Sequence, residues 1–167
     1  MDQRLNLIYS RRSIRRFSQA PLPQDTLDEL LRAAMAAPSF HDARPWEFVV
    51  ITEARLKRQV KEGHPYANFA EEAAAIIVVF GDPDKSLVEH SLAAATQNIL
   101  LAATGLGLGS CWCGMSAERQ APIRHITGIP PNKWIISLVC VGIADEQKEP
   151  RTLYDASRVH WQRYGGE

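Results

Sequence analysis

The feature that most constrains the fold is an unbroken apolar run, Ala75-Ile76-Ile77-Val78-Val79-Phe80. Its length and its β-branched residues predict a strand, and the lack of alternation with polar residues predicts that both strand faces are buried. The residues Gly81-Asp82-Pro83-Asp84 then turn the chain. The run therefore predicts the central strand of a sheet that is flanked by helices.

Helical patterns surround this strand. Residues 86–104 predict the longest helix, which is apolar nearly all round and rich in alanine, so it should be buried in the core or in a subunit interface. Apolar residues at helical spacing run from Leu27 to Met35, and Pro38 ends that helix. Shorter helices are expected at residues 5–9, 54–62 and 118–126.

Three further strands are expected, at residues 46–52, 110–115 and 134–141. Because helices and strands alternate irregularly, the sequence favours an α+β fold with a mixed sheet of four to five strands. A length of 167 residues fits one domain, residues 1–167. The tail, residues 146–167, has no core pattern, and its Trp161 and Tyr164 favour packing on another subunit over disorder.

The overall composition excludes several classes of protein. Basic and acidic residues balance at 19 each, which argues against a nucleic-acid partner. No apolar run approaches the ~18 residues of a membrane span, and the first nine residues do not read as a signal peptide. Three cysteines cannot all pair within one chain, so we expect reduced thiols and a cytoplasmic protein.

The local charge is concentrated in Arg11-Arg12-Ser13-Ile14-Arg15-Arg16-Phe17, which places four arginines around one serine. Like charges at this spacing repel one another unless an anion answers them. Guanidinium forks and a hydroxyl suit a phosphate group, because they can bond two of its oxygens at once. The cluster therefore predicts a phosphate site.

Other motifs supply no catalytic set of side chains. The Gly105–Gly109 repeat is followed by Ser110 where a dinucleotide fingerprint needs glycine, so it is either a helix end or a close approach to a flat ligand. Cys111 and Cys113 are too close in sequence for a usual zinc pair, and no metal site is expected. A Cys–His hydrolase has no specific support. A phosphate site without such a set suits an enzyme whose chemistry belongs to a bound cofactor.

The arginine cluster, the loop from Pro38 to Trp46 and the strand from Gly109 to Gly114 occur in an order that resembles the nitroreductase family of FMN-dependent oxidoreductases. The similarity runs from Arg11 to Tyr164. The resemblance implies an α+β homodimer with two FMN sites at the subunit interface. It also implies a C-terminal arm, about residues 146–167, that is exchanged between the subunits.

The resemblance further implies roles for individual residues. Arg11 and Ser13 would hold the FMN phosphate, and Arg15 would reach the N1/O2 edge of the flavin. The loop would approach the flavin from the other subunit, with Asp42 and Arg44 in place of the family's usual asparagine and glutamine. Lys148 could supply a second basic residue near Arg151. The implied FMN-binding residues are Arg11, Arg12, Ser13, Arg15, Pro38, Ser39, Phe40, Arg44, Cys111, Trp112, Cys113, Gly114 and Arg151.

The implied activity is ping-pong reduction. NADH or NADPH would deliver hydride to flavin N5, and a nitroaromatic, quinone or similar electron-poor acceptor would then be reduced, with no catalytic side chain. A flavin-binding or storage module without turnover is one alternative, and a flavin-modifying or dehalogenating relative is another. Such relatives carry lid insertions, and the short connection from Phe80 to Ser86 favours a simple reductase. Nucleic-acid binding through the arginines is a third alternative, which the neutral pI disfavours.

Overall fold

In the computed structural model, which describes residues 2–84 and 86–166, the apolar run forms strand β2 (Ala75–Gly81), and all of its residues are buried. The sheet contains four strands in the order β1 (Trp46–Ile51), β2, β4 (Trp134–Gly142) and β3 (Gly109–Gly114). The α+β class and a four-stranded central sheet are thus confirmed.

The expectation of a mixed sheet is wrong, because every pair of neighbouring strands is antiparallel. The helix that follows β2 does lead to a strand of the same direction, β3. However, β4 lies between these two strands and runs against both of them. An isolated parallel bridge joins Ser13, in the N-terminal segment, to Ser110 of the edge strand β3.

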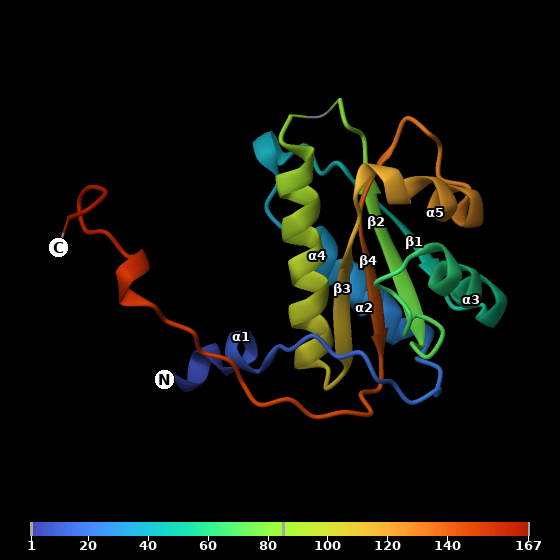
Figure 1. Ribbon diagram of the computed structural model, residues 1–167, viewed down its shortest axis with the longest axis horizontal. Coiled ribbons are helices and arrows are strands. Elements are labelled where there is room, and N and C mark those ends of the chain that lie inside the picture. The colour runs from blue at the N-terminus through green and yellow to red at the C-terminus, as the bar shows by residue number, and fades with distance from the viewer. Residues whose placement is uncertain (1, 85, 167) are drawn as a thin grey trace.

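The two faces of the sheet are covered by different helices (Figure 1). Ala75, Ile77 and Val79 pack with α2 (Gln24–Met35) and α4 (Val88–Gly105). The alternate residues Ile76, Val78 and Phe80 pack on the other face, with Val60 of α3 (Ala54–Gly63) and Ile123 of α5 (Gln120–Thr127). Successive side chains of a strand point to opposite faces, so an apolar run without alternation satisfies both layers.

The helices lie close to their expected positions. The long apolar helix begins at Val88, two residues later than the pattern predicts, and it packs against α2 and the sheet. None of the described helices is both long and apolar enough to cross a membrane. The remaining helical elements are α1 (Asn6–Ser10) and the 3₁₀ turns η1 (Gln3–Leu5), η2 (Phe40–Asp42), η3 (Ala117–Arg119) and η4 (Ala156–Arg158).

The N-terminal segment lies along the edge of the sheet, beside the chain that leaves β4. The Ile14 N–H donates to the Ser110 carbonyl at 2.9 Å, and the Ser18 N–H donates to the Ile143 carbonyl at 2.9 Å. A Cβ on Gly109 would lie 2.7 Å from Cγ2 of Ile14, so this glycine is needed for the close approach of the two segments. Gly107, with φ +73°, lies just beyond the end of α4. The glycine repeat therefore ends a helix and seats the N-terminal segment.

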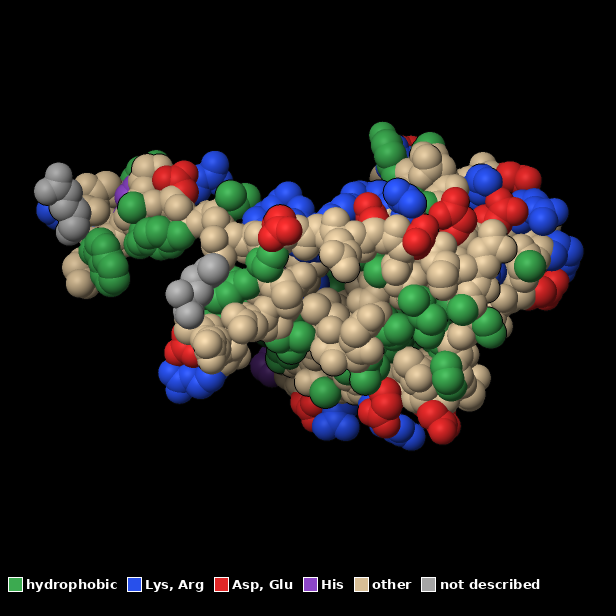
Figure 2. Space-filling model, turned by 90° about the horizontal axis from the view of Figure 1, so that it is seen from below, with side chains coloured by type: hydrophobic (Ala, Val, Ile, Leu, Met, Phe, Trp, Pro, Cys, Tyr) green, Lys and Arg blue, Asp and Glu red, His purple; other side chains and the backbone are tan. Residues whose placement is uncertain are grey.

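The first part of the expected arm, residues 146–151, lies against the N-terminal segment of its own chain. The remaining part, residues 152–166, which we call the C-terminal arm from here on, extends away from the body of the protein (Figures 1 and 2). Its residues 152–165 are all exposed, and Figure 2 shows hydrophobic side chains along it. Trp161 is 62% exposed and Tyr164 is 91% exposed. Large aromatic side chains are rarely left this open on a monomer, so the arm presents apolar surface that its own chain does not cover.

Candidate functional site

The N-terminal arginines line a small concave space with residues that follow the last strand. This space, which we call the basic hollow, has a volume of about 200 Å³. Its lining comes from residues 11–15 and 148–151, two segments that are far apart in the sequence. The lining residues are Arg11, Arg12, Ser13, Arg15, Lys148 and Arg151. The structure thus brings the predicted phosphate-binding residues together, with Lys148 among them.

The chain's own contacts fix the hollow and leave part of its charge unused. Lys148 Nζ donates to the Ser13 carbonyl at 2.6 Å and lies 3.1 Å from a Glu146 carboxylate oxygen. The Arg12 guanidinium donates to the Glu149 carbonyl. Within residues 2–84 and 86–166, the guanidinium groups of Arg11 and Arg151 have no acceptor or carboxylate partner. Their donors are therefore available to an anion.

Glu146 anchors the arginine segment at its backbone. Its Oε1 accepts the Arg15 N–H at 2.5 Å. This bond, together with the Lys148 ammonium, lowers the pKa of Glu146 below the usual range, so the carboxylate is ionised at neutral pH. The anchor holds the backbone of Arg15 and leaves the guanidinium of Arg15 free to point elsewhere.

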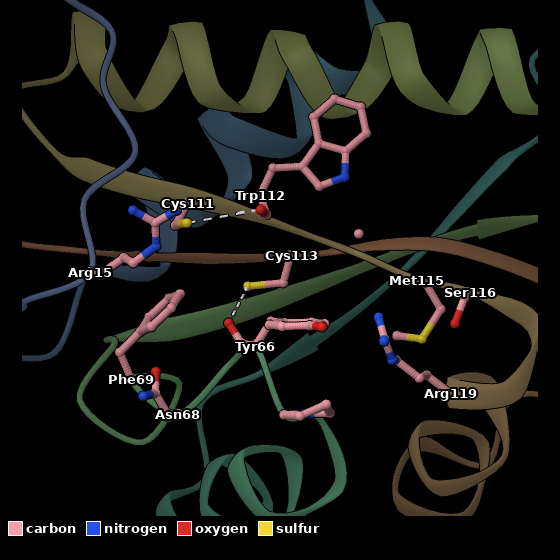
Figure 3. Close-up of a pocket in the computed structure, with 12 residues that line it drawn as sticks. Arg15, Tyr66, Asn68, Phe69, Cys111, Trp112, Cys113, Met115, Ser116 and Arg119 are labelled. Atoms are coloured by element: carbon pink, nitrogen blue, oxygen red, sulfur yellow. Dashed lines mark hydrogen bonds between the residues drawn. The ribbon is translucent and has the colours of Figure 1, made fainter.

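A larger cavity adjoins the basic hollow, and Arg15 lines both. This space, which we call the sheet cavity, has a volume of about 660 Å³ and lies over the β3 edge of the sheet, on the face covered by α3 and α5. In Figure 3 the side chains of Arg15 and Arg119 lie at opposite ends, with Tyr66 between them. The lining residues are Arg15, Pro65, Tyr66, Asn68, Phe69, Cys111, Trp112, Cys113, Gly114, Met115, Ser116 and Arg119.

Several of these lining residues were not predicted from the sequence. The connection between α3 and β2 contributes Tyr66, Asn68 and Phe69, and the chain after β3 contributes Met115 and Arg119. A signal was present in residues 64–69, which combine aromatic and polar side chains without helical or strand periodicity. Such a connection ahead of a buried strand is a common place for binding residues.

The β3 residues present different sides to the cavity. Cys111 and Cys113 belong to the core face that carries the sheet cavity, whereas Trp112 packs toward α4 on the opposite face. Trp112 and the exposed Gly114 therefore offer mainly backbone to the cavity. Next to them, the fully buried His64 ring contacts the Gly114 carbonyl through Nε2 at 3.1 Å.

The thiols of this strand are poor nucleophiles. Hydrogen bonding to Cys113 and burial raise the pKa of Cys111 far above its ordinary value. At Cys113, hydrogen bonding with the Cys111 thiol lowers the pKa. Hydrogen bonding with the Cys140 thiol and burial outweigh this effect and raise the pKa of Cys113 to about 12. Neither thiol is hydrogen-bonded to a histidine, so the Cys–His hydrolase is not supported. In the described part of the chain, no group of three or more His, Cys, Asp or Glu residues is placed to hold a metal.

The predicted loop residues do not join either cavity in their own chain. Pro38, Ser39, Phe40 and Arg44 are absent from both linings, and the loop lies near the start of α4, across the molecule from the N-terminal segment (Figure 1). Arg44 and Asp42 form a two-bond ion pair of 2.8 and 2.6 Å, and the Arg44 N–H donates to Ser39 Oγ at 3.0 Å. The substituted charges of this loop therefore pair with each other.

The fold and the site define a class: an α+β protein in which a large cavity and a smaller basic hollow share Arg15 at one edge of an antiparallel sheet. The Nitroreductase family profile matches residues 8–63 and 54–143. A protein of Archaeoglobus fulgidus, provisionally named NADH dehydrogenase/NAD(P)H nitroreductase, is 34% identical over 98% of this chain and 100% of its own length. The chain belongs to the nitroreductase family.

Solved structures share this architecture. A protein of Parabacteroides distasonis with the same provisional name superposes with a TM-score of 0.92 at 33% identity, covering 98% of this chain and 100% of its own. A provisionally named nitroreductase of Desulfovibrio desulfuricans, solved in complex with FMN, superposes with a TM-score of 0.85 at 26% identity. That match covers 95% of this chain and 96% of the other.

Proposed function

We propose that this protein is an FMN-dependent oxidoreductase that takes hydride from NADH or NADPH and reduces nitroaromatic, quinone or similar electron-poor acceptors. The observation that carries the proposal is the shared residue Arg15: it lines both a basic hollow suited to a phosphate and a cavity large enough for a planar ring. The family membership and the FMN complex of the Desulfovibrio desulfuricans relative support the choice of cofactor.

The donor set fits FMN in both spaces. The uncommitted guanidinium groups of Arg11 and Arg151 suit the two negative charges of a phosphate monoester, and Ser13 offers a hydroxyl. In the sheet cavity, Arg15 presents a cation toward one end, and the backbone of residues 112–114 offers amide and carbonyl groups along the wall. When bound there, FMN would supply the hydride chemistry that no side chain of this chain can perform.

The chain's own residues would bind and orient FMN and would stabilise its reduced form. Arg11, Lys148 and Arg151 would hold the phosphate, and Arg15 would stabilise negative charge that develops at the nearby ring edge on reduction. Among the described residues, no Asp, Glu, Lys or His side chain lines the sheet cavity, and hydrogen bonding together with burial keeps the thiols of Cys111 and Cys113 protonated. Protons for the acceptor would therefore come from water, and no general acid or base is assigned.

We further propose that the working form is a homodimer. Each chain would complete the flavin site of the other with the loop bearing Pro38, Ser39, Phe40 and Arg44, and the arm would pack on the partner. Support comes from the distance of the loop from its own chain's cavities and from the exposed aromatic residues of the arm. The buried, unpaired cysteines favour the cytoplasm.

The first experiment separates an enzyme from a storage module. FMN-loaded protein should oxidise NADH or NADPH steadily when menadione or a nitrofuran is supplied, and oxidation should be slow without an acceptor. Yellow protein with a full complement of FMN and no acceptor-dependent turnover would refute the enzyme. A protein that takes up no FMN would refute the cofactor assignment itself.

A second experiment tests the shared site by mixing subunits. Arg11→Ala would weaken the hollow, and Ser39→Glu would place a carboxylate in the loop. If each site combines the hollow of one chain with the loop of the other, a heterodimer of the two variants has one intact site and one doubly altered site. It should regain about half of the wild-type FMN, whereas each homodimer stays poor in FMN. A heterodimer as poor in FMN as the homodimers would contradict the shared site.

A further inference from the structure

Arg119 is a charged side chain of the sheet cavity that the proposed FMN site does not use. It is half-buried at the junction of η3 and α5, at the opposite end of the cavity from Arg15 (Figure 3). Its guanidinium carbon lies 4.6 Å from the ring centroid of Tyr66, which is a cation–π contact. The fold thus holds a guanidinium beside an exposed aromatic ring inside a cavity.

No acidic side chain in the described part of the chain neutralises the charge of Arg119. The adjacent acid, Glu118, accepts the Ser116 hydroxyl at 2.8 Å, and its carboxylate is not among the cavity-lining groups. Across residues 2–84 and 86–166, no Asp or Glu carboxylate forms an ion pair with Arg119. The sheet cavity therefore carries two guanidinium groups and no acid, and only one of these groups, Arg15, lies next to the basic hollow.

We propose that Arg119 is a specificity-determining residue that selects acceptors whose planar ring bears an anionic oxygen group, above all an aromatic carboxylate. This inference rests on the proposed function. A guanidinium fork matches a carboxylate with two parallel hydrogen bonds, and the partial enclosure of the cavity strengthens them relative to open water. The neighbouring Tyr66 ring offers an aromatic face to the ring that carries the anion.

The position of Arg119 favours an acceptor over the phosphates of NADPH as the source of the anion. Arg119 lies beside an aromatic side chain within the cavity, so it would meet a group attached directly to a bound ring. In a nicotinamide nucleotide, the 2′-phosphate is separated from the nicotinamide by two sugars and a pyrophosphate. The experiment nevertheless includes both co-substrates, so that the two sources are distinguished.

The test compares 4-nitrobenzoate with its neutral analogue 4-nitrobenzamide, using the FMN-loaded full chain. Arg119→Gln removes the charge, Arg119→Lys keeps the charge without the fork, and Arg55→Gln is the matched control because Arg55 lies on α3, outside both cavities. Arg119→Gln should lower kcat/KM for 4-nitrobenzoate by roughly 10- to 100-fold, as expected for a lost charged hydrogen bond, and leave 4-nitrobenzamide within about threefold. Arg119→Lys should fall between, and Arg55→Gln should change neither substrate.

Direct binding supplies a second measurement that does not depend on turnover. Benzoate should perturb the absorption spectrum of the bound flavin in the wild type, and in Arg119→Gln it should bind at least about tenfold more weakly. Equal losses for the benzoate and the benzamide would overturn the proposal. So would a selective loss of NADPH-dependent flavin reduction with an unchanged ratio of the two acceptors. Failure of the proposed function looks different: the wild type would hold no FMN, or would hold FMN and turn over neither acceptor.

Discussion

The basic hollow and the loop at residues 38–44 are both made of residues expected at the flavin, but the chain treats them in opposite ways. The hollow is assembled within one chain, because Lys148 bonds the Ser13 carbonyl and Glu146 holds the Arg15 N–H. The loop bonds mainly to itself, through the pair of Arg44 with Asp42, and reaches the body through a 3.4 Å contact from the Phe40 N–H to Ser91.

The backbone of the loop carries a further sign of function. His41, Asp42 and Arg44 all have positive φ, at 50°, 53° and 44°, a region that non-glycine residues seldom occupy. These residues are exposed, and the bonds that hold this conformation run mainly within the loop itself. A strained loop conformation that serves neither cavity of its own chain is consistent with a role in the site of a second subunit. This difference supports the proposed shared site, in which one chain would supply a preformed hollow and a loop shaped for the site of its partner.

The largest effect should follow removal of the arm. A chain that ends at Arg151 retains the hollow but loses Trp161 and Tyr164, the exposed aromatic residues expected to anchor the partner. We expect a monomer with little bound FMN, measured by light scattering and by flavin absorbance. Trp161→Ala alone should weaken the dimer by about 2 kcal/mol, as for a central aromatic anchor. A truncated chain that stays dimeric and fully loaded would show that the arm holds neither the partner nor the site.

A smaller effect is expected from Arg11→Ala, which alters only the basic hollow. Loss of an uncommitted guanidinium should weaken FMN binding by roughly 10- to 100-fold while the fold and the dimer remain intact. Flavin titration gives the dissociation constant, and circular dichroism checks the fold. The matched control is Arg16→Ala, because Arg16 belongs to the same cluster but pairs with Asp145 outside the hollow. If both variants retain FMN equally, Arg11 does not hold the phosphate.

The sequence predicts those parts of this architecture that depend on local pattern. Strand β2 can be predicted because a strand buried on both faces has apolar residues at every position. The helices on either side of it can be predicted from the spacing of their apolar residues. The arginine cluster predicts an anion site, because four like charges within seven residues repel one another unless an anion binds to them. The match to the family profile confirms the resemblance that orders these motifs.

Features that depend on distant partners could not be predicted in this way. The position of β4 between β2 and β3 is decided by packing across the sheet, and nothing in the strand sequences encodes it. The sheet cavity likewise combines Tyr66 with Arg119, two residues whose contact exists only after α3 and α5 have packed beside each other. Neither residue belongs to a motif, so only the fold reveals the pair.

The buried His64, which lies behind the sheet cavity and contacts the Gly114 carbonyl, gives a prediction about pH. Burial lowers the pKa of His64 from its ordinary 6.5, so below about pH 6.5 the unfolded chain binds more protons than the folded chain. The free energy of unfolding should therefore decrease as the pH falls, by up to about 1.4 kcal/mol per pH unit until the folded pKa is reached. His64→Gln, whose amide can still donate to the Gly114 carbonyl, should flatten this slope in urea unfolding between pH 7.5 and pH 5. An unchanged slope would mean that another group titrates.

The smallest effect should separate two neighbouring acids that hold the arginine segment. The Glu146 side chain is 19% exposed, and it accepts a backbone N–H while facing Lys148. The Asp145 side chain makes an exposed pair with Arg16, at 3.2 Å, and the backbone N–H of Asp145 donates to the Arg16 carbonyl, a bond that a side-chain substitution leaves in place. Glu146→Gln should lower the free energy of unfolding by about 1 kcal/mol at pH 7, because a charged acceptor is lost, whereas Asp145→Asn should cost at most about 0.5 kcal/mol.

The pH dependence of stability should distinguish Glu146 from Asp145 further. The folded-state pKa of Glu146 lies below the ordinary 4.5, so its contribution to stability is complete above pH 4.5 and is lost as the pH falls through the folded value. The difference in unfolding free energy between the wild type and Glu146→Gln should therefore shrink below pH 4.5, and that of Asp145→Asn should stay small throughout. Urea unfolding at pH 7 and below pH 4 measures both. Equal costs for the two variants at pH 7 would mean that the hollow is held by the sheet-edge backbone bonds alone, and that its preformed state does not depend on Glu146.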